Sequence, residues 1–202
     1  AGKQADGVLV DVGSTTTDIV VLQNGQYKPR GFSDSERLTS DTLIYTGVVR
    51  TPVMAVVQRV PFNGQMQRIA AEHFATMADV YRLIVKLPAK HDLAETADGQ
   101  GKSQLESARR LARMLGRDVE SAPMLAWQAL AHFIANTQLQ DLLTVVKAQG
   151  LATLIGAGVG RFVVYEMAQR LKISYVDFAS LVEGDTANDA AVCAPAYAVA
   201  KL

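Results

Sequence analysis

The sequence has little of several features that would point to a particular class of protein. Its 202 residues contain one cysteine, Cys193, so an internal disulfide is excluded and we expect a reducing compartment, the cytoplasm. Lys and Arg together number 20 and Asp and Glu also number 20, so no excess charge attracts nucleic acid or an anionic membrane. No apolar run reaches the about 20 residues that span a bilayer. We therefore expect a globular protein without a nucleic-acid or membrane partner.

Histidine is also scarce. The three histidines, His73, His91 and His132, show no spacing typical of metal ligands. The spacing indicates no Ser-His-Asp or Cys-His arrangement either. The glycine-rich and hydroxyl-rich segments are therefore the better candidates for chemistry.

Hydrophobic periodicity divides the chain into three parts. Residues 7–32 predict a meander of three strands, at 8–12, 19–22 and 27–32, with Asn24-Gly25 as a hairpin turn. Residues 33–150 predict a mixed and then mostly helical block. Its expected elements are a hairpin about Asn63-Gly64, a helix within 75–87, a helix at 103–116 capped by Ser103 and Glu106, and helical structure over 122–150.

The last part, residues 151–202, changes rhythm. It predicts a strand at 151–155, a helix at 161–172, a strand at 173–178 and a final Ala-rich helix, which together form a right-handed βαβ unit followed by a helix. A meander, then helices, then βαβα is the element order of a ribonuclease-H-like domain, whose fourth and fifth strands extend the sheet in parallel. The expected fold is therefore α/β, one ribonuclease-H-like domain over residues 1–202 with a largely helical insertion.

The stretch DVGSTTTD joins the first two predicted strands. Gly13 permits a tight turn and a close approach of backbone to ligand. Hydroxyl groups and backbone N–H groups, which form an anion cradle, follow at four consecutive residues: Ser14, Thr15, Thr16 and Thr17. Asp11 and Asp18 would repel a phosphate, so we expect them to hold Mg²⁺ against its oxygens. The alternative is a turn whose hydroxyls merely cap the backbone.

The stretch TADGQGKS, residues 96–103, resembles the end of a Walker A loop. It lacks the first glycine of that motif, because Thr96 stands there, and no apolar strand precedes it. Gly99, Gly101 and the Lys102 ammonium could still surround an anion at the start of a helix. A plain glycine-rich connector with a solvated Lys102 is the equal alternative.

The stretch GAGVG, residues 156–160, lies between a predicted strand and a predicted helix, and Asp177 ends the next strand. Its glycine spacing is not that of a dinucleotide-binding fingerprint, which makes a Rossmann fold a weak interpretation. Gly156 and Gly158 either let a nucleotide or another flat ligand lie on the backbone or allow close packing of helix on strand.

DVGSTTTD and GAGVG together resemble the superfamily of actin, sugar kinases and Hsp70, in which two ribonuclease-H-like halves clamp a phosphate-bearing ligand. DVGSTTTDIV is similar to the hydantoinase and oxoprolinase branch of it. Four further strings resemble the tetrahydromethanopterin-linked C1-transfer pathway proteins: ERLTSDTLIYTGVVRTPV, AAEHFATMADVYRL, TADGQGKS and RRLARMLGRD. Archaeal members of that family are methanofuran-biosynthesis synthases. They join an aminomethylfuran diphosphate to the phenol of glutamyl-tyramine and release diphosphate with Mg²⁺ present.

This resemblance implies roles for particular residues. Asp11 and Asp18 would hold Mg²⁺ and act in catalysis, and residues 13–17 would hold the diphosphate. A second anion contact, with Lys102 as a catalytic residue, would come from Asp98, Gly99 and Lys102. Arg50 would pair with diphosphate or with a substrate carboxylate, or else be a solvated or structural arginine.

Members of this family carry a first half ahead of the point where this chain begins, so the resemblance implies that the chain is a second half. The missing half or a second chain is then an expected partner, with homo-oligomer formation left open. An ATP-dependent kinase or oxoprolinase, in which GAGVG faces adenosine, is the rival enzyme class. A non-catalytic half that binds its partner half is the remaining alternative.

Overall fold

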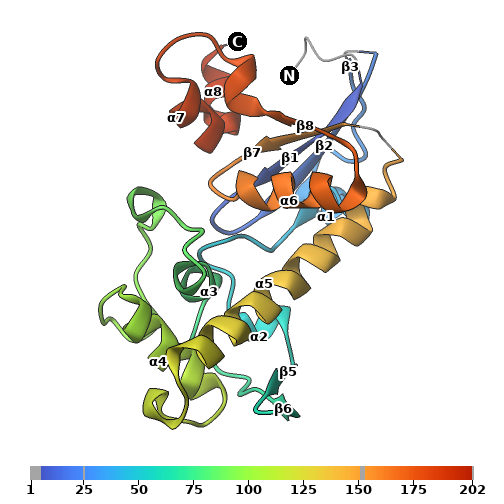
Figure 1. The fold of residues 1–202 in the computed structure, drawn as a ribbon. Helices are drawn as coiled ribbons and strands as arrows, with labels where there is room; N and C mark the ends of the chain where they lie inside the picture. Colours follow the sequence, from blue (N-terminus) through green and yellow to red (C-terminus); the bar gives the residue numbers. More distant parts are fainter. Residues whose placement is uncertain (1–5, 25, 151–152, 202) are drawn as a thin grey trace. The chain divides into compact units, whose positions relative to one another are not determined.

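The structure, a computed structural model, describes residues 6–24, 26–150 and 153–201 (Figure 1). The chain divides into two compact units. Unit 1 consists of Ala1–Gly47 and Asp141–Leu202, and unit 2 consists of Val48–Gln140. The sequence predicts one domain with an inserted block at residues 33–150, and unit 2 lies inside that block. The single-domain organisation itself stays a prediction.

Among the described residues, unit 1 contains a six-stranded sheet with the strand order β3-β2-β1-β7-β8 and with β4 paired to β2. β1 and β2 are antiparallel, whereas β1, β7 and β8 are parallel. The predicted α/β class is therefore confirmed as a mixed sheet with helices. The strands are β1 (Gly7–Val12), β2 (Thr17–Gln23), β3 (Gln26–Tyr27), β4 (Leu43–Ile44), β7 (Thr153–Ala157) and β8 (Ser174–Asp177).

The end of the predicted meander differs from the structure. The third strand, predicted at 27–32, already ends at Tyr27. Pro29 follows closely and has no N–H group to donate to a ladder. Helix α1 (Asp34–Thr39) comes next, with a capping box formed by Ser33 and Glu36 that the sequence analysis missed. Gly25 and the first two residues of the predicted strand 151–155 lie outside the described residues.

The two faces of the sheet in unit 1 are covered by different helices (Figure 1). On one face, α6 (Arg161–Leu171) packs against β1 and β7, and its Tyr165 ring contacts the Tyr175 ring edge-on at 5.2 Å between centroids. On the other face, a core cluster joins Leu22 and Ile155 to residues of the C-terminal segments. These segments are a 3₁₀ helix (Phe178–Leu181), α7 (Ala187–Val192) and α8 (Ala194–Ala200).

Unit 2 contains the predicted hairpin. β5 and β6 are joined by Asn63 and Gly64, whose φ angles of 48° and 76° are those of a two-residue hairpin turn. The sequence predicts that residues 54–62 flank this turn as a strand, but residues 54–56 belong to α2 and the strand begins only at Arg59. The elements of this part of the chain are α2 (Val53–Val56), β5 (Arg59–Phe62), β6 (Gln65–Arg68), α3 (Met77–Leu83), α4 (Gln104–Met114) and α5 (Met124–Lys147), and α5 continues into unit 1.

The predicted helices of unit 2 are confirmed. Ser103 and Glu106 form the expected capping box of α4, and Gly116 follows its end with a φ of 64°. The Trp127 ring of α5 stacks on Phe62 with 4.7 Å between centroids, and its N–H donates to the Val119 carbonyl. In the described residues, no helix combines the length and the apolar character needed to cross a membrane.

Candidate functional site

The stretch DVGSTTTD forms the turn between β1 and β2, as predicted. β1 ends at Val12 and β2 begins at Thr17, and the Gly13 N–H donates to the Thr16 carbonyl at 2.8 Å. The hydroxyls of Ser14 and Thr15 lie 3.4 Å apart. The turn is therefore closed by its own backbone, and it exposes hydroxyl groups at its tip.

Three backbone N–H groups of this turn remain available. Among the described residues, the N–H groups of Ser14, Thr15 and Thr16 donate to no protein acceptor. Consecutive free N–H groups beside hydroxyls are the donors that an anion cradle requires. Thr17 differs, because its side chain is buried and its hydroxyl donates to the Thr46 carbonyl at 2.7 Å. The structure thus leaves three of the four hydroxyl residues partly exposed and buries the fourth.

Gly47 supports the turn from the side. A Cβ at this position would stand 2.5 Å from the Ser14 carbonyl carbon and from the Thr15 nitrogen. Real Cβ atoms do not approach backbone so closely, so only glycine fits here. The segment Thr46-Gly47 therefore holds the turn in place through backbone contact, a role that the sequence analysis did not find.

Asp11 and Asp18 are paired across the ladder of β1 and β2, immediately before and after the turn. Asp18 accepts a hydrogen bond from the Arg37 guanidinium at 2.5 Å, and this group also donates to the Thr42 carbonyl. The Asp11 side chain forms no hydrogen bond or ion pair within the part of the chain that the structure describes. Its burial and, second, the charge of Asp18 raise the pKa of Asp11 to about 7.

The GAGVG stretch lies next to the same turn. The Gly160 N–H donates to the Val12 carbonyl at 2.8 Å, and the Gly158 N–H donates to the Ala191 carbonyl. Gly158 has a φ of 82°, and a Cβ there would stand 2.3 Å from an oxygen of Asp11. Gly158 therefore makes room for the Asp11 carboxylate, and both N–H groups are already used by the protein.

Gly156 is explained by packing as well. A Cβ at this position would stand 2.7 Å from the Tyr175 ring, which covers the strand there. Arg161, at the start of α6, pairs with Asp177 at 3.1 Å. Contacts with Asp11 of β1 and Tyr175 of β8 thus account for both glycines, and both the packing of helix on strand and a flat ligand on this backbone stay predictions.

A cavity of about 680 Å³ opens on the sheet face that carries the two acids, and no motif in the sequence pointed to it. Its floor consists of Leu9 and Asp11 from β1 and Asp18 and Val20 from β2. Its walls are mostly apolar and aromatic: Tyr27, Gly31, Phe32, Arg37, Phe178, Ala194, Pro195, Tyr197 and Ala198. All of these residues belong to unit 1.

The stretch TADGQGKS lies in unit 2 and takes part in an ion-pair network. Arg110 is fully buried and pairs with Asp79 and Asp98, at 2.8 and 2.9 Å. Lys102 donates to the backbone carbonyl of Asp92 and lies 3.4 Å from its carboxylate. These contacts match a structural connector more closely than a ligand loop, and an anion contact at Asp98, Gly99 and Lys102 stays a prediction.

Two aspartates of this network, Asp92 and Asp98, have lowered pKa values. Burial raises the pKa of Asp92, but the hydrogen bonds and charge of Arg82 outweigh it, and the net pKa is lowered. For Asp98, burial likewise raises the pKa, and the Gln100 N–H and Arg110 lower it further than burial raises it. A Cβ at Gly101 would stand 2.5 Å from the Glu106 carboxylate, so this side chain would have to shift to accept another residue there.

Arg50 also lies in unit 2 and is exposed. Within the described ranges it makes no ion pair, so it is available to an anionic ligand. The predicted residues therefore fall into two groups. One group lies in unit 1, near the end of β1 and the start of β2: Asp11, Asp18, the turn 13–17, Gly156 and Gly158. The other group belongs to unit 2: Arg50, Asp98, Gly99 and Lys102.

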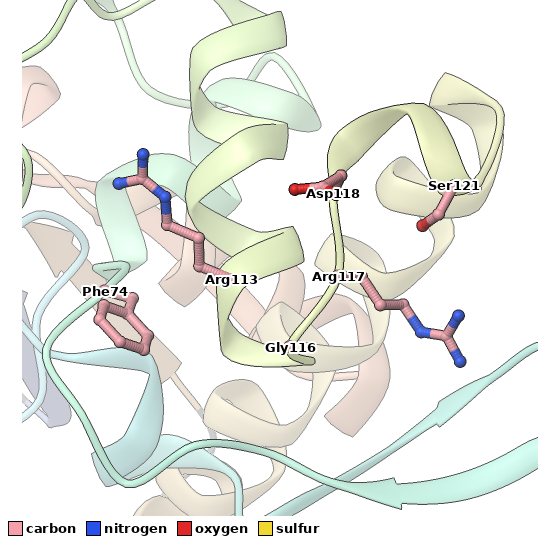
Figure 2. A pocket seen from close by; sticks show the side chains of 6 residues that line it. All are labelled: Phe74, Arg113, Gly116, Arg117, Asp118 and Ser121. Atoms are coloured by element: carbon pink, nitrogen blue, oxygen red, sulfur yellow. The ribbon is translucent and has the colours of Figure 1, made fainter.

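A second pocket, of about 480 Å³, lies in unit 2 and is lined by Phe74, Arg113, Gly116, Arg117, Asp118 and Ser121. Figure 2 shows that the guanidinium groups of Arg113 and Arg117 point in opposite directions. Arg113 pairs with Asp98 at 3.1 Å, and Arg117 lies over the Phe62 ring at 5.3 Å. The two cations do not converge on one ligand, so this pocket is a weak candidate for an anion site.

In the described part of the chain, no three side chains of His, Cys, Asp or Glu come together as metal ligands. Asp11 and Asp18 lie opposite each other as two acids, and Arg37 already pairs with Asp18. Mg²⁺ is commonly bound by one or two carboxylates together with substrate phosphates and water. The pair therefore fits Mg²⁺ where a phosphate-bearing ligand supplies the remaining oxygens.

Two curated relatives carry the same name, (4-{4-[2-(gamma-L-glutamylamino)ethyl]phenoxymethyl}furan-2-yl)methanamine synthase. The protein from Methanocaldococcus jannaschii is 28% identical over 199 residues, which cover 96% of this chain and 58% of that protein. The protein from Methanococcus vannielii is 25% identical over 199 residues, covering 96% of this chain and 89% of that protein. The chain thus spans little more than half of the first relative.

A family model described as hydantoinase/oxoprolinase matches residues 1–202, the whole of the chain. The hydroxyl-rich turn and its two flanking aspartates lie within the matched region. The chain therefore belongs to the hydantoinase/oxoprolinase family.

Proposed function

We propose that the protein containing this chain is a transferase of methanofuran-type C1-carrier biosynthesis. It joins an aminomethylfuran diphosphate to a phenolic amine and releases diphosphate. The phenol oxygen forms a bond to the furfuryl methylene carbon, the carbon–oxygen bond to diphosphate breaks with its electron pair leaving on the diphosphate, and the phenol proton is released. The names of the two relatives describe the ether that this reaction forms.

One structural observation carries the proposal. The turn between β1 and β2 offers the unused N–H groups of Ser14, Thr15 and Thr16 together with their hydroxyls. Donors fixed at a position where negative charge develops stabilise a transition state, because they need no reorganisation during the reaction. A diphosphate leaving group gains such charge as its bond to carbon breaks. The turn therefore binds the diphosphate and stabilises its departure.

Asp11 and Asp18 would hold Mg²⁺ beside the bound diphosphate, with Asp11 as the ligand that Arg37 does not neutralise. The ion would supply charge neutralisation for the leaving group. Arg50, Asp98, Gly99 and Lys102 of unit 2 remain proposed anion contacts of the complete protein.

The fold supports membership of the actin, sugar kinase and Hsp70 superfamily. The strand order β3-β2-β1-β7-β8 supports this proposal, because antiparallel β1–β3 followed by β7 and β8 parallel to β1 is the arrangement expected of a ribonuclease-H-like domain. In that superfamily two such halves form one site. The region of the M. jannaschii relative outside the match, or a second chain, is therefore the proposed partner of this chain.

The test uses the full-length natural protein with aminomethylfuran diphosphate and glutamyl-tyramine. We expect an ether product by mass spectrometry, one diphosphate released per product, no requirement for ATP, and loss of both products when Mg²⁺ is removed by a chelator. A strict ATP requirement would contradict the proposed transferase and favour an ATP-dependent kinase or oxoprolinase. Binding of the partner half without turnover would leave the chain as a non-catalytic component.

A further inference from the structure

The cavity of unit 1 has a polar end and an apolar end. Asp11 and Asp18 face each other on the floor, and Leu9 and Val20 form the next pair on the same face, one step farther from the turn. The hydroxyl-rich turn follows Asp11 two residues later, about 7 Å along the strand. The acids therefore stand between the anion cradle of the turn and the apolar part of the cavity.

The apolar end is built for a flat ring. The rings of Phe178 and Tyr197 meet edge-on with 6.4 Å between centroids, and both line the cavity. Pro195 and the exposed Phe32 add apolar walls. A volume of about 680 Å³ lies within the range of about 300–1,000 Å³ that is typical of small-molecule sites. Aromatic walls favour an aromatic ligand through offset and edge-on ring contacts.

Asp11 supplies an independent sign that a ligand enters here. The residue is 8% exposed, lines the cavity, and makes no hydrogen bond or ion pair with any described residue. A buried carboxylate without a partner costs free energy, so its retention is explained by a ligand or ion that satisfies it. The unpaired group lies at the end of the cavity that is nearer to the turn.

We propose that this cavity holds the ring of the diphosphate substrate, with the ring between Leu9, Val20 and the aromatic walls and the methylene diphosphate directed past Asp11 to the turn. This inference rests on the proposed function, and it adds that recognition of the electrophile's ring lies within unit 1. The turn alone would accept any diphosphate, whereas the cavity selects one that carries a small aromatic or heteroaromatic ring.

The test measures binding of benzyl diphosphate and of methyl diphosphate, each with Mg²⁺ and without the phenol, to the full-length protein by calorimetry. We expect benzyl diphosphate to bind at least about tenfold more tightly, because its ring leaves water for the cavity. Equal affinities, or no binding of benzyl diphosphate, would overturn the inference.

Helix α8 offers a matched pair of variants. Ala198 lines the cavity, whereas Ala196 is also exposed on α8 but does not line it. Ala198→Phe places a ring in the cavity, where it competes with the ligand's ring, and should weaken the preference for benzyl diphosphate while methyl diphosphate binds as before. Ala196→Phe should keep the preference. An unchanged preference in Ala198→Phe, or an equal loss in both variants, would contradict a ring site in this cavity.

The outcome separates this inference from the proposed function. Ring-selective binding without formation of the ether product would support the ring site in the cavity and contradict the proposed transferase reaction. Ether formation without any preference for a ring-bearing diphosphate would retain the transferase and place ring recognition elsewhere in the protein.

Discussion

Asp11 and Asp18 face each other directly across the antiparallel ladder of β1 and β2, and their surroundings differ. Asp18 is paired with the Arg37 guanidinium at 2.5 Å, whereas Asp11 is buried and has no partner among the described residues. Like charges opposite each other in a sheet are destabilising. The repulsion between the two carboxylates is therefore offset by Arg37 at Asp18 and by the uptake of either a proton or a cation at Asp11.

The first prediction concerns the pH dependence of stability, measured without divalent cations. The pKa of Asp11 in the folded chain, about 7, lies above its ordinary value of 3.8, so the folded state binds the proton more tightly than the unfolded state. Stability from this group therefore falls as the pH rises from about 4 through 7, by up to about 4 kcal/mol. Asp11→Asn removes this loss and should be more stable than the wild type at pH 8.

The measurement is the free energy of unfolding in urea at pH 5 and pH 8 for both proteins. Asp185→Asn, at an exposed position of the same unit, is the control and should behave like the wild type. A parallel decrease with pH in wild type and Asp11→Asn would show that Asp11 is not the group responsible.

The second prediction compares two glycines with left-handed backbone. Gly158→Ala places a Cβ 2.3 Å from Asp11 and from the Val12 carbonyl oxygen, so both strain and overlap destabilise it, by more than about 2 kcal/mol. Gly184 also has a positive φ, 98°, but its Cβ would meet nothing within 4 Å. Gly184→Ala should therefore cost only the backbone strain, about 1 kcal/mol. Equal losses in urea unfolding would argue against close packing at Gly158.

The third prediction separates two neighbouring hydroxyls of the turn. Thr16→Val removes a half-exposed donor of the proposed cradle and should lower turnover of the full-length protein about a hundredfold. Thr17→Val removes the hydroxyl that donates to the Thr46 carbonyl, so it should cost about 1 kcal/mol of stability and leave diphosphate affinity unchanged. A turnover assay, calorimetric titration with Mg²⁺-diphosphate and urea unfolding test both variants. Unchanged turnover in Thr16→Val with weaker diphosphate binding in Thr17→Val would move the anion contact to Thr17.

The fourth prediction concerns the ion-pair network of unit 2. Arg110→Met leaves the buried Asp79 without this partner and should destabilise the chain by about 3–5 kcal/mol. Arg110 also pairs with Asp98, and Arg113, whose side chain is 50% exposed, pairs with Asp98 as well. Arg113→Met should cost less than about 1 kcal/mol of stability. Thermal unfolding distinguishes them. Similar losses in the two variants would mean that burial does not govern the strength of this network.

Local sequence signals predicted several elements whose structure depends on near neighbours, although the capping box of α1 was missed. The alternation of apolar residues predicted β1, β2, β7 and β8, Asn63-Gly64 predicted the hairpin of unit 2, and Ser103 with Glu106 predicted the start of α4. The turn between Asp11 and Asp18 was predicted for the same reason, because its strands and its glycine are contiguous in the sequence. The third strand shows the limit of such signals, since it was predicted over 27–32 but ends at Tyr27, two residues before Pro29.

Tertiary structure decided what the candidate site contains. The cavity combines β1 and β2 with Phe178 and α8, whose residues are more than 150 positions apart in the chain, and no local pattern encodes such a meeting. The same holds for Gly47 against the turn, Gly158 against Asp11, and Lys102 on Asp92. A sequence shows which residues can bind a phosphate or a ring, because that depends on their chemistry. Which of them remain free to do so depends on partners that only folding brings within hydrogen-bond distance.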